Sequence, residues 1–175
     1  MESANLLHLY TGDGKGKTTA ATGLALRAAG AGRRVLFVQF FKDGSSSEVK
    51  ALRSVPGVAV RICPVQHGFF RDMDDDTRRR AVADFTALFE AAAAEAAENA
   101  DLLVLDEAVS ACNHGMIPKD ALLRFLREKP EGLEVVLTGR DPAPELLELA
   151  DYVTEMRKIR HPYDRGIRAR KGVEF

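Results

Sequence analysis

Glycines and lysines alternate in a short run near the N-terminus, where residues 12–19 read GDGKGKTT. An apolar segment, Leu6 to Tyr10, precedes this run, and a segment with helical spacing, Thr18 to Ala29, follows it. A glycine-rich turn between a strand and a helix lets backbone N–H groups and the positive end of the helix dipole face one concavity. The pattern therefore predicts a phosphate-binding loop (P-loop), in which Lys17 reaches the outer phosphates of a nucleotide and the Thr18 hydroxyl holds a magnesium ion. The residues expected to surround the phosphates are Gly12, Asp13, Gly14, Lys15, Gly16, Lys17, Thr18 and Thr19.

The spacing of this loop differs by one residue from the common phosphate-binding pattern. That pattern, G-x-x-x-x-G-K-[ST], would place a glycine at position 11, where this chain has Thr11. Counted from Gly12, the loop is one residue shorter, which predicts an altered pose of the phosphate chain. The alternative interpretation is a tight strand-to-helix turn with surface lysines, but the paired lysines, the three glycines and the flanking elements favour a nucleotide site.

Further charged residues follow two apolar segments that are typical of buried strands. Asp106 and Glu107 come directly after Leu102 to Leu105, and Arg140 follows Leu133 to Thr138 closely. The carboxyl ends of parallel strands meet at one edge of a sheet, where ligands bind in open α/β folds. Either carboxylate is therefore a candidate for ordering a metal ion or contacting the nucleotide, and Arg140 for neutralising phosphate charge. The alternatives are a helix N-cap for the acidic pair and an ordinary surface position for the arginine.

The rest of the chain alternates apolar runs of strand length with segments of helical period. Such an order predicts an α/β fold with a parallel sheet, right-handed crossovers and helices on both faces of the sheet. The expected strands are Leu6–Tyr10, Val35–Phe41, Val58–Ile62, Leu102–Leu105, Leu133–Thr138 and Tyr152–Met156. The expected helices are Thr18–Ala29, one through Val49 and Leu52, Thr77–Asn99, Lys119–Lys129 and Glu145–Leu149. Pro64–Asp76 is expected to be a functional loop, and Arg157–Phe175 a basic, turn-rich tail.

Length and composition limit the classes of protein that this sequence can encode. The 175 residues are 46% apolar and 29% charged, and they suit one domain, residues 1–175, with its own core. A formal net charge of -1 argues against general binding of nucleic acid. No apolar run reaches the roughly 20 residues of a membrane span, and the N-terminus has no signal-peptide pattern. Cys63 and Cys112 have neither metal-like spacing nor an obvious pairing, which favours a reduced, cytoplasmic protein.

Several other polar residues are interpreted as structural or surface residues. A single loop histidine is more often a polar surface residue than a metal ligand, so His67, His114 and His161 are not predicted to ligate a metal. The acidic residues within 72–76 directly precede a helix. They are expected to stabilise the N-terminus of that helix rather than to hold a metal ion.

Longer matches along the sequence point to one protein family. They comprise Tyr10–Ala21, Ala25–Ala28, Val38–Phe40 and Leu105–Glu107. The most specific matches are C-terminal: Val136–Arg140, Ala150–Asp151, Val153–Arg157, His161–Pro162 and Lys171–Phe175. A generic P-loop protein would not share this C-terminal part. With these residues, the whole chain resembles the ATP:corrinoid adenosyltransferases of the CobA/CobO/BtuR type, also called cob(I)alamin adenosyltransferases.

The resemblance implies a RecA-like P-loop fold, usually assembled as a homodimer, and a particular reaction. In this family the cobalt(I) of a reduced corrinoid attacks the 5′ carbon of ATP and expels inorganic triphosphate, which leaves deoxyadenosine bonded to cobalt. The resemblance also implies Mg²⁺ or Mn²⁺, an electron donor such as a reduced flavoprotein, and cob(I)alamin or cob(I)yrinic acid a,c-diamide as the corrinoid. The alternative is an ATP-binding or corrinoid-binding protein of the same family that has lost adenosyl transfer.

The resemblance also assigns roles to individual residues around the nucleotide. Lys17 and Thr18 match the phosphate and metal contacts of the family, and Glu107 matches an acidic residue near the metal and the nucleotide. Arg27 and Arg140 match further basic positions. The resulting metal candidates are Thr18, Asp106 and Glu107.

A loop in the middle of the chain matches the corrinoid side of the family's site. Phe69 matches an aromatic wedge beneath the corrinoid, which removes the lower axial ligand of cobalt and so eases reduction. The family pattern Gly-Phe-Thr-Trp reads Gly-Phe-Phe-Arg at residues 68–71, so Arg71 replaces the partner tryptophan. The expected catalytic residues are therefore Lys17, Glu107 and Phe69. The basic tail is a candidate for covering the triphosphate or contacting the corrinoid.

Overall fold

Six parallel strands form one sheet, in the order β3-β2-β4-β5-β1-β6. The computed structural model describes residues 6–42, 44–63, 65, 67 and 72–174. The strands are β1 (Leu7–Thr11), β2 (Val35–Gln39), β3 (Val58–Ile62), β4 (Leu102–Asp106), β5 (Glu134–Thr138) and β6 (Tyr152–Glu155). The predicted parallel sheet is confirmed, and each predicted strand is present, with ends that agree to within two residues.

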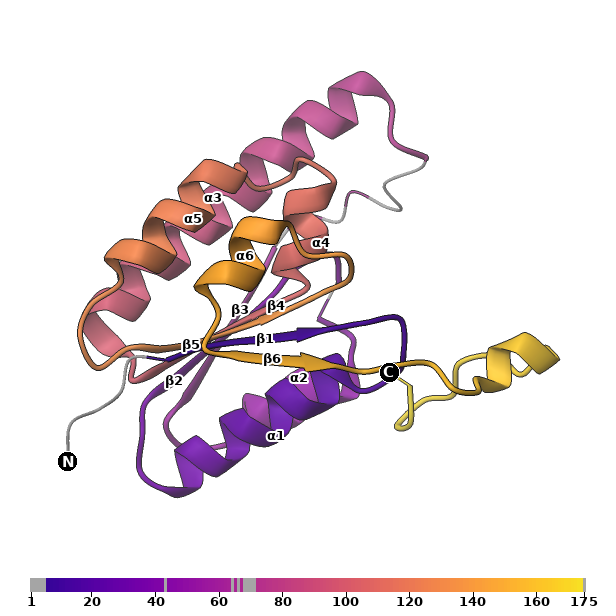
Figure 1. Ribbon diagram of the computed structural model, residues 1–175, viewed down its shortest axis with the longest axis horizontal. Coiled ribbons are helices and arrows are strands. Elements are labelled where there is room, and N and C mark those ends of the chain that lie inside the picture. The colour runs from indigo at the N-terminus through magenta and orange to yellow at the C-terminus, as the bar shows by residue number, and fades with distance from the viewer. Residues whose placement is uncertain (1–5, 43, 64, 66, 68–71, 175) are drawn as a thin grey trace.

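Helices cover both faces of this sheet, as the alternating order predicts (Figure 1). The helices are α1 (Lys17–Gly30), α2 (Ser47–Leu52), α3 (Asp75–Asn99), α4 (Ala108–Asn113), α5 (Lys119–Glu128) and α6 (Pro144–Leu149). Figure 1 shows α1 and α2 on one face and the other four helices on the opposite face. No helix within the described part of the chain is both long and apolar enough to cross a membrane.

The core consists of two apolar layers, one on each face, because successive side chains of a strand point to opposite sides. In β4, Leu102 and Val104 pack in the layer beneath α1, whereas Leu103 and Leu105 pack in the layer beneath α3 and α5. The apolar residues that α1 buries are all alanines, whereas α3 buries two phenylalanines as well as alanines. The buried apolar residues of the two helices are Ala21, Ala25 and Ala28 in α1, and Ala81, Phe85, Phe89, Ala92 and Ala96 in α3.

One helix, α4, was not expected from the sequence. It has only six residues and starts directly after Glu107, so it is too short to show a helical period. The acidic segment before α3 behaves as predicted, because Asp74 is the N-cap and its carboxylate accepts a hydrogen bond from the Thr77 amide at 2.7 Å.

The strand order brings the carboxyl ends of β1, β2, β4 and β5 to one edge of the sheet. The P-loop follows β1, and α1 begins at its end. The tail leaves the end of β6 beside this loop, extends away from the sheet and returns (Figure 1), so that Gly172 to Glu174 line the same cavity as the P-loop. The predicted nucleotide residues and the tail therefore share one edge of the molecule.

Candidate functional site

The start of α1 offers unpaired backbone donors at the carboxyl edge of the sheet. The first helical hydrogen bond runs from the Ala20 amide to the Gly16 carbonyl at 2.8 Å, so the amides of residues 17–19 have no acceptor within the helix. Gly16 is the N-cap, with a φ of 125° that only glycine adopts readily, and no side chain caps the helix. These amides and the helix dipole make the end of α1 suitable for binding an anion.

Lys17 is buried at the base of this loop. Its Nζ donates hydrogen bonds to the Gly12 carbonyl at 2.6 Å and to the Gly14 carbonyl at 2.9 Å. A lysine ammonium has three N–H donors, so a third can serve a phosphate oxygen. Desolvation lowers the pKa of Lys17, and the nearby Arg140 lowers it further, whereas Glu107 acts in the opposite direction. A bound triphosphate would favour the charged lysine.

The outer side of the loop is attached to the chain that follows β6. The Gly14 amide donates to the Met156 carbonyl at 2.6 Å, and the Asp13 carboxylate accepts from the Lys158 amide at 2.9 Å. This bond lowers the pKa of Asp13. A Cβ at Gly12 or Gly14 would lie 2.5 Å from the Met156 carbonyl oxygen, so both positions require glycine. We expected successive loop amides to face the phosphates, but the Gly14 amide binds Met156 instead.

Asp106 and Glu107 have different surroundings although they are adjacent. Asp106 is fully buried, and its carboxylate accepts from the Thr138 hydroxyl at 2.7 Å and from the side-chain Nε2 of Gln39 at 2.9 Å. Asp106 is not among the described residues that line the adjacent cavity, whereas Glu107 is. The arrangement suits Asp106 for holding the strand ends together and Glu107 for contacting a ligand.

The backbone of Glu107 is in the left-handed region, with φ of 63°. The Thr138 hydroxyl accepts from the Glu107 amide at 2.8 Å, and the Ser110 hydroxyl donates to the Glu107 carboxylate at 2.7 Å. A non-glycine residue in this region costs about 1 kcal/mol or more, and such strain is concentrated at functional sites. The strained turn directs the chain from β4 into α4 and keeps the Glu107 carboxylate at the cavity.

Two cations that follow the strands on either side of β4 add positive charge to the wall of the cavity. Arg140 follows β5 and lines the cavity as expected. Lys42 follows β2 and also lines it, with its Nζ 3.6 Å from a Glu48 carboxylate oxygen and 4.0 Å from one of Asp106. Sequence reasoning missed Lys42, although its place just after a predicted strand was the same signal that identified Arg140.

These groups surround a cavity of about 500 Å³. Besides the P-loop, its wall includes Thr22 and tail residues. The Thr22 hydroxyl is the one buried side-chain polar atom, within the described chain, that lacks a hydrogen-bond partner. A buried polar group without a partner is rare, so this hydroxyl indicates that a ligand completes the site. The tail residues of the wall are His161, Ala169, Gly172, Val173 and Glu174.

The donor set near the start of α1 fits a hard divalent cation. The Thr18 hydroxyl and the Glu107 carboxylate both border the cavity, and both offer oxygen atoms. Mg²⁺ prefers oxygen ligands and is usually held by one or two protein groups together with phosphate oxygens and water. The residues present therefore fit a magnesium ion carried with a nucleotide.

The structure does not bring all the predicted residues to this cavity. Arg27 is exposed in the last turn of α1, ten positions after Lys17 and hence about 15 Å along the helix, and it is not among the described lining residues. Phe69 and Arg71 lie outside the described residues.

Of the three histidines that were predicted to be surface residues, two lie in other surroundings. His161 is half-buried and lines the cavity, and the His67 side chain is only 5% exposed, with Nε2 2.9 Å from an Asp84 carboxylate oxygen. His114 is exposed, as expected. The sequence around His67 and His161 did not indicate these positions, because the residues that surround each side chain come from distant segments of the chain.

Comparison with known proteins identifies what the chain is similar to. Residues 3–175 match the family described as ATP:corrinoid adenosyltransferase BtuR/CobO/CobP. The corrinoid adenosyltransferase of Pseudomonas aeruginosa is 36% identical over 99% of this chain and 85% of its own length. The corrinoid adenosyltransferase CobA of Salmonella typhimurium is 31% identical over 99% of this chain and 87% of its own length.

Similarity to solved structures concerns the fold. ATPases 2 and 3 of EccC from Thermomonospora curvata superimpose with a TM-score of 0.52 and 19% identity, over 85% of this chain and 30% of that chain. At this identity the similarity shows a shared α/β architecture and carries no information on the reaction.

Proposed function

The chain belongs to the family of ATP:corrinoid adenosyltransferases, and we propose that it transfers the 5′-deoxyadenosyl group of ATP to the cobalt(I) of a reduced corrinoid, with release of triphosphate. The observation that carries the proposal is the cavity at the carboxyl edge of the sheet. There the free amides of α1, the buried Lys17 and the strained Glu107 surround a space large enough for a nucleotide.

The proposed reaction needs no nucleophile or general base from the protein. The cobalt(I) lone pair forms a bond to the 5′ carbon of ATP, the bond between that carbon and oxygen breaks, and its electrons leave on triphosphate. The work of the chain is to hold the 5′ carbon in line with cobalt and to stabilise the charge on the leaving group. Positioning alone can supply roughly 7–11 kcal/mol of such a barrier.

Each part of the cavity has a role in this proposal. The amides at the start of α1 and the Lys17 ammonium bind the triphosphate, and Arg140 and Lys42 add positive charge from the strand ends. Thr18 and Glu107 hold the magnesium ion, which when bound supplies further charge neutralisation of the triphosphate. The Thr22 hydroxyl donates a hydrogen bond to the bound nucleotide, which gives this buried group the partner that it lacks.

The corrinoid side of the reaction rests on the family resemblance. Cob(I)alamin or cob(I)yrinic acid a,c-diamide is the proposed acceptor, Phe69 the proposed wedge beneath the ring, and a reduced flavoprotein the proposed electron donor. A homodimer in the cytoplasm is the proposed working form. Arg27, which lies away from the cavity, is proposed to contribute only if a partner subunit or the corrinoid reaches the last turn of α1.

An anaerobic assay tests the proposed reaction directly. Protein, ATP, magnesium and chemically reduced corrinoid are mixed, and cobalt(I) absorbance and phosphate products are followed together. We expect the absorbance to decay with release of one triphosphate per cobalt alkylated. Release of phosphate or diphosphate would instead identify an ATPase, and nucleotide binding without any product would identify a binding protein.

A further inference from the structure

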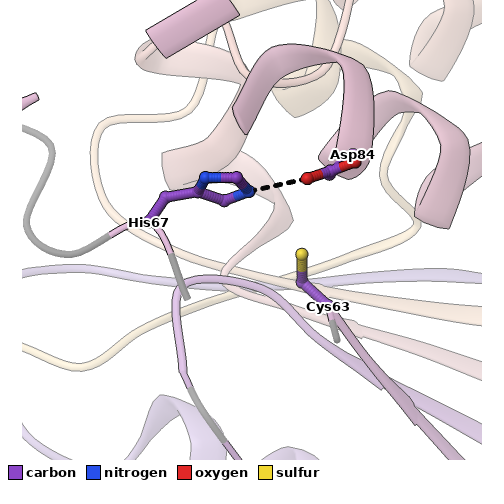
Figure 2. Close-up of side chains that lie close together, drawn as sticks. All are labelled: Cys63, His67 and Asp84. Atoms are coloured by element: carbon purple, nitrogen blue, oxygen red, sulfur yellow. Dashed lines mark hydrogen bonds and ion pairs between the residues drawn. The ribbon is translucent and has the colours of Figure 1, made fainter. Parts of the chain in front are cut away.

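Three potential metal ligands converge at the edge of the sheet beyond β3, outside the nucleotide cavity. Cys63 directly follows β3, His67 lies four residues later, and Asp84 projects from α3. One donor atom from each residue lies within 4.8 Å of the donor atoms of the other two. Figure 2 shows the His67 ring and the Asp84 carboxylate facing each other, with the Cys63 thiol pointing toward them from the end of the strand.

The surroundings of the cluster hold its two softer ligands, Cys63 and His67, in buried positions. Cys63 is 5% exposed, and the side chain of His67 is 5% exposed. The His67 ring also packs against Phe85, with ring centroids 6.1 Å apart. Asp84 is 39% exposed and, with His67, borders an open cavity of about 440 Å³. Two ligands are thus held by packing, and the site stays accessible from one side.

The geometry differs from that of a catalytic relay. In a Cys-His-Asp relay, the two ring nitrogens of histidine contact different partners. Here Nε2 faces Asp84 at 2.9 Å, and the other ring nitrogen points away from Cys63 (Figure 2). The three donor atoms lie within 4.8 Å of one another, an arrangement closer to the ligands of a single ion than to a relay.

We propose that Cys63, His67 and Asp84 form a binding site for a soft divalent transition-metal ion, Zn²⁺ in the first instance. Sulfur, imidazole nitrogen and carboxylate oxygen are the three ligand types that zinc takes. Ligands of one tetrahedral zinc ion lie about 3.4–3.6 Å apart, given its usual bond lengths. Shifts of about 0.5–1 Å in these side chains therefore suffice to close the site.

The fourth position of this ion faces the open cavity. Three protein ligands and a position for water or another small ligand are typical of accessible zinc sites. On binding, the Cys63 thiol, which donates to the Val65 carbonyl at 3.3 Å, gives its proton to solvent. The His67 ring keeps its proton on Nδ1 in place of Nε2, and the ion takes the place of the hydrogen bond between His67 and Asp84. The ion then ties the segment after β3 to α3.

This site is distinct from the proposed magnesium site. Its three ligands are not among the described residues that line the nucleotide cavity, and two of its donors, the Cys63 sulfur and the His67 nitrogen, are softer than the oxygens of Thr18 and Glu107. Magnesium, which requires oxygen ligands, is therefore not expected to compete for it. The three ligands take no part in the proposed adenosyl transfer, so zinc binding does not depend on that reaction.

Calorimetric titration of the full chain tests the site. The protein is stripped with a chelator and titrated with zinc chloride, without nucleotide and with excess magnesium. We expect one zinc ion per chain. Cys63→Ser and Asp84→Asn should each weaken binding by at least the roughly 10- to 100-fold that follows loss of an outer partner of a metal ligand. Cys112→Ser and Asp76→Asn are matched controls and should bind as the unaltered chain does.

Cobalt(II) ion replaces zinc in a second measurement, because its spectrum reports thiolate coordination. We expect a charge-transfer band from sulfur to cobalt in the unaltered chain and its loss in Cys63→Ser. If Cys63→Ser fails to fold by circular dichroism, the half-exposed Asp84→Asn and the spectrum of the unaltered chain decide. Absence of zinc binding, binding unchanged in Asp84→Asn, or a cobalt spectrum without the sulfur band would overturn the proposal.

Discussion

At the scale of single residues, the candidate site depends on polar groups whose partners are incomplete or strained. Lys17 is buried with a lowered pKa, Thr22 has a hydroxyl without a partner, and Glu107 has a left-handed backbone. Each of these features costs stability in the ligand-free chain. An anionic nucleotide would favour the charged form of Lys17 and give the Thr22 hydroxyl a hydrogen-bond partner. Its metal ion would bind the Glu107 carboxylate, which the left-handed backbone keeps at the cavity.

Replacing Lys17 removes the one buried cation of the loop. We expect Lys17→Ala to lower adenosyl transfer by roughly 10²–10³-fold, because a donor aimed at the charge of the leaving group is lost. Initial rates with saturating corrinoid and a calorimetric ATP titration measure the effect. Lys50→Ala, on the exposed side of α2, is the control and should leave both unchanged. Equal rates for the two variants would contradict the assigned role.

Replacing Glu107 with asparagine distinguishes the effect of backbone strain on stability from the effect of the carboxylate on metal binding. Asparagine tolerates the left-handed region better than glutamate, so Glu107→Asn should keep the free energy of unfolding or raise it by up to about 1 kcal/mol. Transfer should fall roughly tenfold or more, since the carboxylate that holds the metal is lost. Urea unfolding and the magnesium dependence of the rate measure the two effects.

The control for this change is Glu107→Gln, which removes the charge and keeps a side chain of the same size. Its activity should fall as in the asparagine variant, without any gain in stability. A Glu107→Asn protein with full activity would exclude the carboxylate from metal binding.

At the scale of elements, tight turns at the strand ends create the site. Among the residues that the structure describes, three other than glycine have positive φ, and each follows a strand: Phe41 after β2, Glu107 after β4 and Asp141 after β5. Gly139, also after β5, has φ of 147°, and a Cβ there would lie 2.6 Å from the Val109 Cβ. Close packing of α4 against the end of β5 therefore fixes the position of Arg140.

Two glycine-to-alanine variants test this packing. Gly139→Ala should destabilise the fold by about 1–3 kcal/mol and weaken ATP binding, because α4 or the Arg140 turn must move. Gly23→Ala, inside α1 with nothing within 4 Å of its added Cβ, should instead stabilise by about 0.5–1 kcal/mol. Thermal and urea unfolding measure the change in the free energy of unfolding for each variant. A change of the same sign in both variants would contradict close packing of α4 against the end of β5.

Asp101 joins the starts of β2 and β4 at the opposite edge of the sheet. Its carboxylate accepts from the Arg34 amide at 2.8 Å and from the Arg34 guanidinium at 2.8 Å. The guanidinium hydrogen bond and then the amide lower the pKa of Asp101 below its ordinary value of 3.8. Because the folded pKa is lowered, this stabilisation is present above the ordinary value and is lost as pH falls through the folded pKa.

Asp101→Asn should therefore reduce the free energy of unfolding by about 1 kcal/mol at neutral pH, a value that allows for solvent screening of the half-exposed pair. The difference from the unaltered chain should shrink as pH falls below the ordinary value of 3.8. Urea unfolding at a series of pH values measures it, with the exposed Glu98→Gln on α3 as the control. A difference that persists in acid would show that the carboxylate charge is not the cause.

At the scale of the whole molecule, the tail closes one side of the nucleotide cavity. It leaves β6 beside the P-loop and is attached there through Met156 and Lys158, and its later residues return to the cavity wall (Figure 1). Most of the tail is exposed and adds little to either apolar layer of the core. The tail is therefore expected to contribute to ligand binding far more than to stability.

Removing residues 159–175 tests whether the tail contributes to ligand binding rather than to stability. We expect the melting temperature to stay within about 2–4 °C, which corresponds to roughly 1 kcal/mol in a chain of this size. ATP affinity should fall about tenfold, or about 1.4 kcal/mol. Tyr163→Ala, which alters a tail residue that is 72% exposed, is the control and should bind ATP normally. A truncated chain with full ATP affinity would exclude the tail from the site.

The sequence by itself determined the class of fold and the chemistry of the main loop. Apolar runs and helical periods are local signals, so the strands, most helices and the Asp74 cap could be predicted from nearby residues. The same holds for Lys17, Thr18 and Glu107, whose residue types and positions after strands indicate phosphate and metal chemistry. The six-residue α4 gave no such signal.

Only the tertiary structure decided which of these residues meet. The Leu7 amide binds Asp151, 144 positions away, and β1 lies between β5 and β6, the last strands of the chain. Pairings of this kind depend on the whole sheet, and a local pattern does not contain them. For that reason the use of the Gly14 amide by Met156, the place of Lys42 at the cavity and the convergence of Cys63, His67 and Asp84 emerged only from the folded chain.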